Sequence, residues 1–231
     1  MPSVLITGTD RGLGLEFSRQ YAQAGWRVFA CCRRPEQAVA LHRLAREHPQ
    51  LSVHRLDVGD HGQIDALADE LRDAAIDVLL NNAGVYGDEA QQGFGNLDYE
   101  RWAQVFRINT MAAVKMAEAF VAQVARSDRR VIAALSSKMG SIADNTSGDS
   151  YLYRSSKAAL NAAMKSLAID LAPRRIAVLI LHPGWVQTRM GGEQAPLPAA
   201  DSVAGMRGII DRFTLADSGR FLNYDGREIP W

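Results

Sequence analysis

The chain has 231 residues, with 26 basic and 26 acidic side chains, and therefore carries no net charge at pH 7. Nucleic acids and anionic membranes favour partners with a basic excess, so the composition argues against both. Hydrophobic residues make up 47% of the chain, as is usual for a globular protein. We expect one domain over residues 1–231, because nothing in the pattern divides the chain.

The two cysteines, Cys31 and Cys32, are adjacent. Neighbouring residues of a strand point to opposite faces, which makes a disulfide between them unfavourable. No apolar run approaches the ~18 residues of a membrane helix, and the N-terminus lacks the pattern of a secretion signal. The Cys and His spacing predicts no metal site. We therefore expect a cytoplasmic protein.

Short apolar runs alternate along the chain with longer helical patterns. The expected strands are 4–7, 27–31, 52–56, 76–81, 130–135, 176–181 and 220–223. The expected helices are 12–24, 36–47, 60–74, 99–126 and 151–171. This alternation predicts an α/β fold, a three-layer, doubly wound parallel sheet of about seven strands of the Rossmann type. Such sheets bind ligands beyond the carboxyl ends of their strands.

Three long segments follow strand ends on that side of the predicted sheet. They span 85–97, 141–150 and 183–200, and they are rich in glycine, proline or polar residues. Loops of this length at a binding edge are candidate lids, and disorder is the alternative.

The stretch Thr-Gly-Thr-Asp-Arg-Gly-Leu-Gly at 7–14 lies between the first strand and the first helix. Gly8 permits a tight turn, Gly12 and Leu13 bring the backbone close to a ligand, and Gly14 lets the helix pack on the strand. Free amides at a helix N-terminus attract an anion. The spacing differs from the commoner G-x-G-x-x-G fingerprint, so a simple structural turn is the alternative.

The end of the second strand bears on the choice of cofactor. NAD-binding folds of this type place a carboxylate there for the ribose hydroxyls, whereas this chain has Cys32 followed by Arg33 and Arg34. Arginine suits phosphate, so convergence of Arg11 and Arg33 on a 2′-phosphate favours NADP(H) over NAD(H). A solvated charge pair is the alternative, and it is the favoured interpretation of Arg34.

The next two strand ends also carry candidate cofactor residues. Asp57 and Val58 follow the third strand, where the carboxylate can accept a hydrogen bond from the adenine amino group, although a helix cap is an alternative. Asn82, Ala83 and Gly84 follow the fourth strand. The amide can tie two strands together while the small residues admit the cofactor, and a plain turn is the alternative.

Tyr153 and Lys157 are four residues apart in a predicted helix and therefore share one face. A free tyrosine has a pKa of about 10, and a nearby positive charge lowers that pKa. We expect Lys157 and an oxidised nicotinamide ring to make Tyr153 an acid or base for a carbonyl or alcohol. The pair alone is also compatible with an ordinary exposed helix face.

Other polar residues are expected around this pair. Ser137 ends the fifth strand and can hold the substrate oxygen, with Ser136 as the alternative serine. Asn109 lies within a helix where an apolar residue would pack better, and it can bridge to Lys157 through water. After the sixth strand, His182 is interpreted as structural rather than catalytic. Backbone groups of the turn that follows and one hydroxyl can hold the nicotinamide amide and phosphates, at Pro183, Gly184, Val186 and Thr188.

Together these motifs resemble the short-chain dehydrogenase/reductase family. The similarity covers nearly the whole chain and comprises Thr-Gly-x-x-x-Gly-x-Gly at 7–14, Asn-Asn-Ala-Gly at 81–84, Asn109, Ser137, Tyr-x-x-x-Lys at 153–157 and Pro-Gly-x-x-x-Thr at 183–188. Residues 136–162, His-Pro-Gly-Trp-Val at 182–186 and the last six residues are similar to its C-factor-like and sniffer-type carbonyl reductase branch. The interval from Ser137 to Tyr153 is slightly longer than is usual in the family.

The resemblance implies an NADP(H)-dependent oxidoreductase with Tyr153 as acid or base, Lys157 holding the ribose, Ser137 positioning the substrate and Asn109 in a proton relay. The expected substrate is an aldehyde, ketone or quinone, or the corresponding alcohol. An NADP(H)-binding regulatory or signalling protein with little turnover is the alternative, because the C-factor name is associated with cell–cell signalling. Candidate residues for an apolar substrate wall are Tyr86, Met139, Trp185 and Met190, which core packing explains nearly as well.

Small residues are frequent in two of the predicted helices. Ala112, Ala113, Ala117 and Ala119 lie in one helix, and Ala158, Ala159, Ala162 and Ala163 lie in the other. Related proteins pair these helices between subunits, so we expect a homodimer or homotetramer, although packing on the sheet would use alanine equally well.

Overall fold

The computed structural model describes residues 1–88 and 93–231. Residues 89–92, which belong to the predicted 85–97 loop, lie outside the described residues. Its seven strands form one parallel sheet in the order β3-β2-β1-β4-β5-β6-β7. Their bounds are β1 Ser3–Thr7, β2 Arg27–Cys32, β3 Leu51–Arg55, β4 Val78–Asn81, β5 Val131–Leu135, β6 Ala177–His182 and β7 Phe221–Asn223. The predicted doubly wound α/β fold is thereby confirmed.

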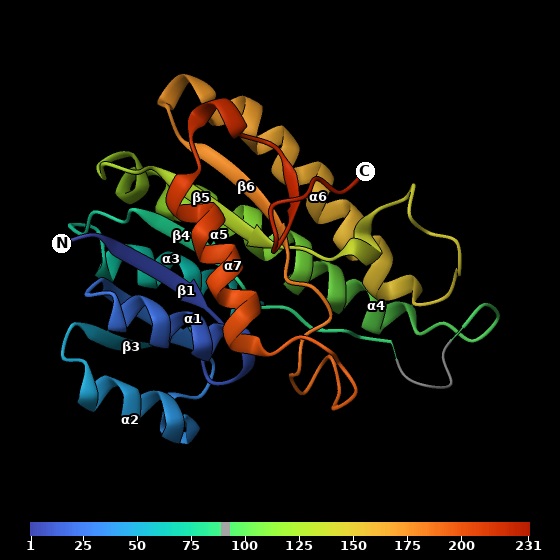
Figure 1. Ribbon diagram of the computed structural model, residues 1–231, viewed down its shortest axis with the longest axis horizontal. Coiled ribbons are helices and arrows are strands. Elements are labelled where there is room, and N and C mark those ends of the chain that lie inside the picture. Colours follow the sequence, from blue (N-terminus) through green and yellow to red (C-terminus); the bar gives the residue numbers. More distant parts are fainter. Residues whose placement is uncertain (89–92) are drawn as a thin grey trace.

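Helices cover both faces of the sheet (Figure 1). The helices are α1 Gly12–Gln23, α2 Val39–Glu47, α3 His61–Glu70, α4 Tyr99–Phe106, α5 Ala112–Ala125, α6 Tyr151–Leu171 and α7 Ala199–Arg212. One core cluster joins the sheet to α3, α5 and α6, and a second joins its other face to α1, α2 and α7. Strands buried on both faces explain the continuous apolar runs in the sequence.

Three helices were predicted with the wrong extent and a fourth was missed. The helix predicted at 36–47 begins at Val39, and the one predicted at 60–74 ends at Glu70. The pattern at 99–126 predicts one helix, but Arg107–Met111 forms a π-helical turn between α4 and α5.

Helix α7 was not predicted, although Val203, Met206 and Ile210 have helical spacing and are fully buried. The predicted loop at 183–200 ends only two residues inside α7, and the rest of this helix, which contains Gly205 and Gly208, was left without an assignment.

The alanines of α5 serve mainly the core of this chain. Ala112, Ala113 and Ala117 are buried against the sheet, whereas Ala162 on α6 is exposed. Most of the α5 alanines that were expected at a subunit interface are therefore explained by packing within one subunit. None of the described helices has both the length and the apolar character needed to cross a membrane.

The sheet changes its winding direction between β1 and β4, which are adjacent although β2 and β3 intervene in the chain. A crevice forms at such a point beyond the carboxyl ends of the strands. The ends of β1, β4 and β5 therefore place the glycine turn, Asn82 and Ser137 around one opening.

Candidate active site

The glycine turn connects β1 directly to α1. Gly8 has φ +72°, and a Cβ at Gly14 would lie 2.1 Å from the Gly8 carbonyl oxygen, so the helix meets the turn closely only with glycine there. Arg11 precedes α1 in an extended conformation, and neither a side-chain cap nor an acidic residue occupies its first turn. The N-terminal amides of α1 are thus available to an anion, which fits a dinucleotide phosphate.

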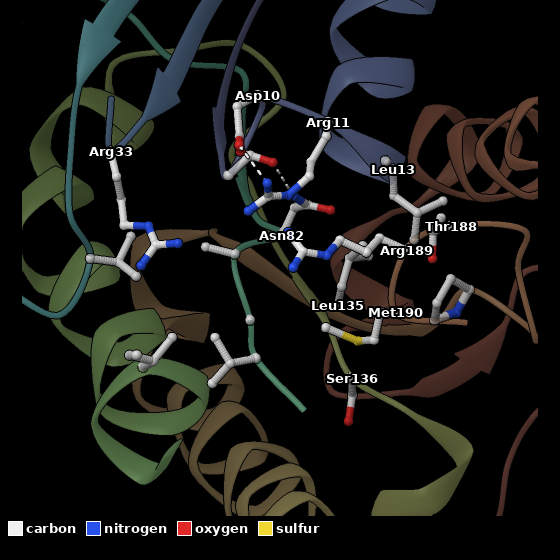
Figure 2. Close-up of a pocket in the computed structure, with 18 of the residues that line it drawn as sticks. Asp10, Arg11, Leu13, Arg33, Asn82, Leu135, Ser136, Thr188, Arg189 and Met190 are labelled. Carbon is white, nitrogen blue, oxygen red and sulfur yellow. Dashed lines mark hydrogen bonds and ion pairs between the residues drawn. The ribbon is translucent and has the colours of Figure 1, made fainter. Parts of the chain in front are cut away.

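A cleft of about 430 Å³ opens beyond the strand ends in front of this turn. Figure 2 shows side chains entering it from the glycine turn, the β4 end and the segment after β6. Most of the predicted site residues line it: Gly8, Arg11, Gly12, Leu13, Arg33, Asp57, Val58, Asn82, Ala83, Gly84, Tyr153, Lys157, Pro183, Thr188 and Met190. Residues spread over the whole chain thus form one cavity large enough for a small-molecule ligand.

Asn82 joins two neighbouring strand ends, as the sequence suggested it could. Its side-chain amide donates to the carbonyl oxygens of Thr7 at 2.7 Å and Gly8 at 3.0 Å. The Thr7 hydroxyl accepts in return from the backbone amides of Asn82 and Ala83. These bonds fix the floor of the cleft, and a Cβ on Gly8 would come within 3.0 Å of Ala83 Cα.

Three arginines surround the cleft: Arg11, Arg33 and Arg189. Arg11 forms an exposed ion pair with Asp10 at 3.5 Å. In Figure 2 the Arg189 side chain extends across the opening toward Asn82. The buried Cys32 occupies the end of β2, where a ribose-binding carboxylate would otherwise be expected. The cleft is therefore better suited to a phosphorylated ligand than to a neutral one.

Asp57 does not cap a helix. Its carboxylate accepts from the backbone amide of Gly59 at 2.9 Å, and α3 is capped by Asp60, which accepts from the amides of Gly62 and Gln63. One Asp57 oxygen thus holds the turn, while the residue lines the end of the cleft.

Tyr153 and Lys157 line the cleft, whereas Ser137 lies beside Tyr153 and is not among the lining residues. The Ser137 side chain lies close enough to the Tyr153 hydroxyl to lower the pKa of that phenol. Lys157 Nζ lies 5.7 Å from the centre of the Tyr153 ring and donates to the Leu135 carbonyl at 2.8 Å. Helix α6 supplies the tyrosine and the lysine from one face, and the end of β5 supplies the serine.

Burial dominates the ionisation of this group. It raises the pKa of Tyr153 to about 12, and the nearby Ser137 side chain opposes that rise. It also lowers the pKa of Lys157 to about 8. Both shifts disfavour the charged forms, as expected where water is excluded. The expected lowering of the Tyr153 pKa by Lys157 is therefore not seen, because burial raises that pKa and Lys157 is not among the groups that shift it.

Ser136 and Ser137 differ in their partners. The Ser136 hydroxyl donates to Asn161 Oδ1 at 2.6 Å, within the core side of α6. The Ser137 hydroxyl accepts from the Met139 amide at 3.1 Å and meets Tyr153. Ser136 lines the cleft, whereas Ser137 lies beside the Tyr153 phenol. This geometry favours Ser137 as the serine that faces a substrate.

Asn109 lies in the π-helical turn and is 2% exposed. Its side chain accepts from the Val85 amide and donates to the Val85 carbonyl, both at 2.8 Å, and it also donates to the Ser156 hydroxyl. A Cβ on Gly84 would lie 3.3 Å from Asn109 Oδ1 and 3.5 Å from Lys157 Nζ. Asn109 thus holds the segment after β4 against α6. A π-helical turn at such a position is common at functional sites.

Several predicted residues lie outside the cleft. Gly14 packs under the turn, Gly184 packs against Leu197 and Tyr224, and Val186 is buried in a bridge to Leu197. Of the predicted substrate wall, Tyr86 packs on Tyr153 with ring centres 4.9 Å apart, while Met139 is half-buried after Ser137. Trp185 is 58% exposed and donates to the Gly191 carbonyl.

Other residues line the cleft without having been predicted as site residues, namely Asp10, Leu56, Val85, Ile108, Leu135, Gln187 and Arg189. Gln187 and Arg189 flank Thr188, so a wider window around the Pro-Gly-x-x-x-Thr motif would have included them. The apolar members occupy strand ends or adjoining turns, where sequence gives no chemical signal.

His182 ends β6, and burial lowers its pKa to about 4. It is not among the residues that line the cleft. No grouping of potential metal ligands occurs among the residues that the structure describes.

Comparisons with known proteins agree with this architecture. The model of the short chain dehydrogenase family matches residues 2–197. The C-signal of Myxococcus xanthus is 45% identical over 166 residues, which cover 72% of this chain and 99% of that protein.

Solved structures extend the similarity to the whole chain. The carbonyl reductase Sniffer of D. melanogaster superposes with a TM-score of 0.91 at 35% identity, covering 100% of both chains. An NADPH-bound carbonyl reductase from chicken fatty liver gives 0.92 at 32% identity, covering 100% of this chain and 99% of that one. On the family match, the cleft and the full-length structural agreement, the chain belongs to the short-chain dehydrogenase family of oxidoreductases.

Proposed function

We propose that the protein reduces aldehydes, ketones or quinones with NADPH, and that Tyr153 is the proton donor. The observation that carries the proposal is that Tyr153 and Lys157 line the same cleft as the glycine turn and Arg33, with Ser137 beside the Tyr153 phenol. A ligand that spans the cleft would bring its reactive end to the tyrosine.

Bound NADPH would supply a hydride to the carbonyl carbon. Tyr153 donates its phenolic proton to the carbonyl oxygen, so the product is an alcohol and the side chain is left as a phenolate. With a pKa of about 12, the phenol is fully protonated at neutral pH, as a proton donor must be. The charge of Lys157 then stabilises the phenolate, because the opposite charges lie in a buried site.

Ser137 and Asn109 act at the edges of this step. The Ser137 hydroxyl, which lies beside Tyr153, can hold the carbonyl oxygen next to the phenol. Asn109 holds the Val85 backbone against α6 and lies beside Lys157, where a water bridge would return a proton to the site. Tyr86, Met139, Trp185 and Met190 remain our candidates for the substrate wall, of which Tyr86 packs directly on Tyr153.

The cleft supports NADP(H) over NAD(H). Arg33 and Arg11 would bind the 2′-phosphate, and Arg189 would bind the pyrophosphate together with the α1 amides. Asp57 and Val58 would border the adenine, and the β4 turn would lie beneath the nicotinamide half. The segment after β6 would hold the nicotinamide amide, mainly through Pro183 and Thr188, with Gly184 and Val186 shaping its backbone.

The cytoplasmic location and the homodimer or homotetramer stay predictions. Exposed apolar residues, such as Met111 in the π-helical turn and Ile169 on α6, are available for a subunit contact.

A second function is favoured by one observation, the 45% identity to the M. xanthus C-signal. On this hypothesis the protein binds NADP(H) and regulates a partner with little turnover. Ser137, Tyr153 and Lys157 are all in place, which argues against this function, because binding alone needs no proton donor.

One experiment distinguishes the two functions. Purified protein is titrated with NADPH and then assayed for NADPH consumption against a panel of aldehydes, ketones and quinones. Turnover of at least one class is expected. Tight NADPH binding without turnover of any class would contradict the reductase and favour the regulatory function.

A further inference from the structure

The helix that carries Tyr153 does not cap its own N-terminus. Ser150, the residue before α6, has φ 50°, and its side chain makes no capping hydrogen bond. Asp149 also has a positive φ, so the chain enters α6 through two consecutive left-handed residues. A side-chain cap normally requires an extended residue at this position, and the first amides of α6 therefore need another acceptor.

Asp88 supplies that acceptor from a different part of the chain. Its carboxylate accepts from the backbone amide of Leu152 at 3.1 Å and from that of Tyr153 at 2.8 Å. Each carboxylate oxygen takes one amide, and a negative charge is favourable at a helix N-terminus. One of the two amides belongs to the proposed proton donor itself.

The segment 86–88 is held in place around this cap. The Tyr86 hydroxyl is 2.8 Å from the Ser150 hydroxyl, and its ring packs on that of Tyr153. The carbonyl oxygen of Gly87 accepts from Arg101 Nε at 2.5 Å. Gly87 has φ +85°, and a Cβ there would lie 2.3 Å from Val105, so only glycine permits this approach to α4.

We propose that Asp88 is a positioning residue for the reaction, on the basis of the proposed function of Tyr153. By fixing the first turn of α6, Asp88 keeps the phenol oxygen beside Ser137 and the Tyr86 ring over the reacting group. Asp88 does not line the cofactor cleft. It therefore acts on the proton transfer step and leaves cofactor binding unchanged.

The test compares Asp88→Ala with Asp60→Ala at a temperature well below the melting temperature of either variant. Asp60 caps α3 by accepting from two backbone amides, as Asp88 does for α6. Asp60→Ala therefore removes a comparable helix cap at a different helix. We expect Asp88→Ala to lower kcat about 10- to 100-fold, as for a displaced reacting group, with an unchanged Kd for NADPH. Asp60→Ala should lose stability and retain kcat.

Asp88→Asn provides the conservative variant. It keeps the shape and one acceptor oxygen, so it should restore part of kcat, and it decides the question if Asp88→Ala does not fold. Wild-type kcat in a folded Asp88→Ala or, failing that, Asp88→Asn variant would overturn the inference and leave the cap purely structural. Full turnover by Tyr153→Phe would instead overturn the proposed function, so the two failures are distinguishable.

Discussion

The two ends of the cleft are built differently. The end near β1 and β2 is made of backbone, because Gly8 and Gly14 close a short turn and the α1 amides face the opening. The end near β5 and β6 is bordered by side chains, among them Tyr153 and Met190, the second of which is 52% exposed. The first can serve any ligand with the same phosphates, whereas the second is free to vary with the substrate. This contrast explains why the cofactor class follows from the structure more readily than the substrate.

The largest effect on turnover is expected at Lys157, at the end of the cleft near β5 and β6. Changing Lys157 to Met removes a buried charge at similar length, so the phenolate is no longer stabilised. We expect kcat to fall about 10²- to 10⁴-fold, the range for assisted proton transfer. Steady-state kinetics with a reducible carbonyl measure it. A variant with wild-type kcat would remove Lys157 from the mechanism.

The end of the cleft near β1 and β2 should distinguish NADPH from NADH through Arg33. Arg33→Gln removes the proposed partner of the 2′-phosphate, and a hydrogen bond to a charged group of this kind corresponds to an affinity loss of about 10- to 100-fold. The Kd for NADPH should rise by that amount, while the Kd for NADH should not change. Fluorescence titration measures both values, and Arg34→Gln is the matched control. Equal weakening of NADPH and NADH would refute the assignment.

Arg189 should behave differently from Arg33, although both line the cleft. The proposed partner of Arg189 is the pyrophosphate, which NADPH and NADH share. We expect Arg189→Gln to weaken both cofactors alike, by about 3- to 10-fold for a partly exposed charged contact. If only NADPH binding weakened, Arg189 would belong with Arg33 at the 2′-phosphate, and the pyrophosphate assignment would be wrong.

A separate effect is on stability, again through Lys157. Its pKa is about 8 in the folded protein and 10.5 as the ordinary value. Between these values the unfolded chain binds more protons, so this residue makes the free energy of unfolding rise with pH from about 8 to 10.5. Denaturant unfolding across this range should show the rise in wild type and a smaller one in Lys157→Met. Parallel pH profiles would indicate that Lys157 is not desolvated.

Much of the fold could be predicted because local rules govern it. The strands follow from apolar runs, and α6 was predicted at its observed bounds because its pattern is long and continuous. The π-helical turn at Asn109 could not be predicted, because the residues around it keep the apolar spacing of a continuous helix. Helix α7 had a signal at Val203, Met206 and Ile210, but two glycines within the helix, Gly205 and Gly208, weaken its helical pattern.

The candidate site divides in the same way. Gly8, Asn82, Tyr153 and Lys157 stand in short motifs at strand ends or on one helix face, so sequence spacing alone brings them to the cleft. Asp88 gives no such signal, because its partners lie 64 and 65 residues further along the chain. Its role depends on how one loop crosses another, which local pattern does not encode.

The most direct test of the account is hydride transfer by Tyr153→Phe. Phenylalanine keeps the ring that packs on Tyr86 and removes only the phenolic oxygen. With NADPH and a carbonyl that the wild type reduces, we predict that the variant binds NADPH with unchanged Kd and shows no detectable nicotinamide oxidation in a single-turnover assay. Oxidation at the wild-type rate would contradict the assignment of Tyr153 as the proton donor.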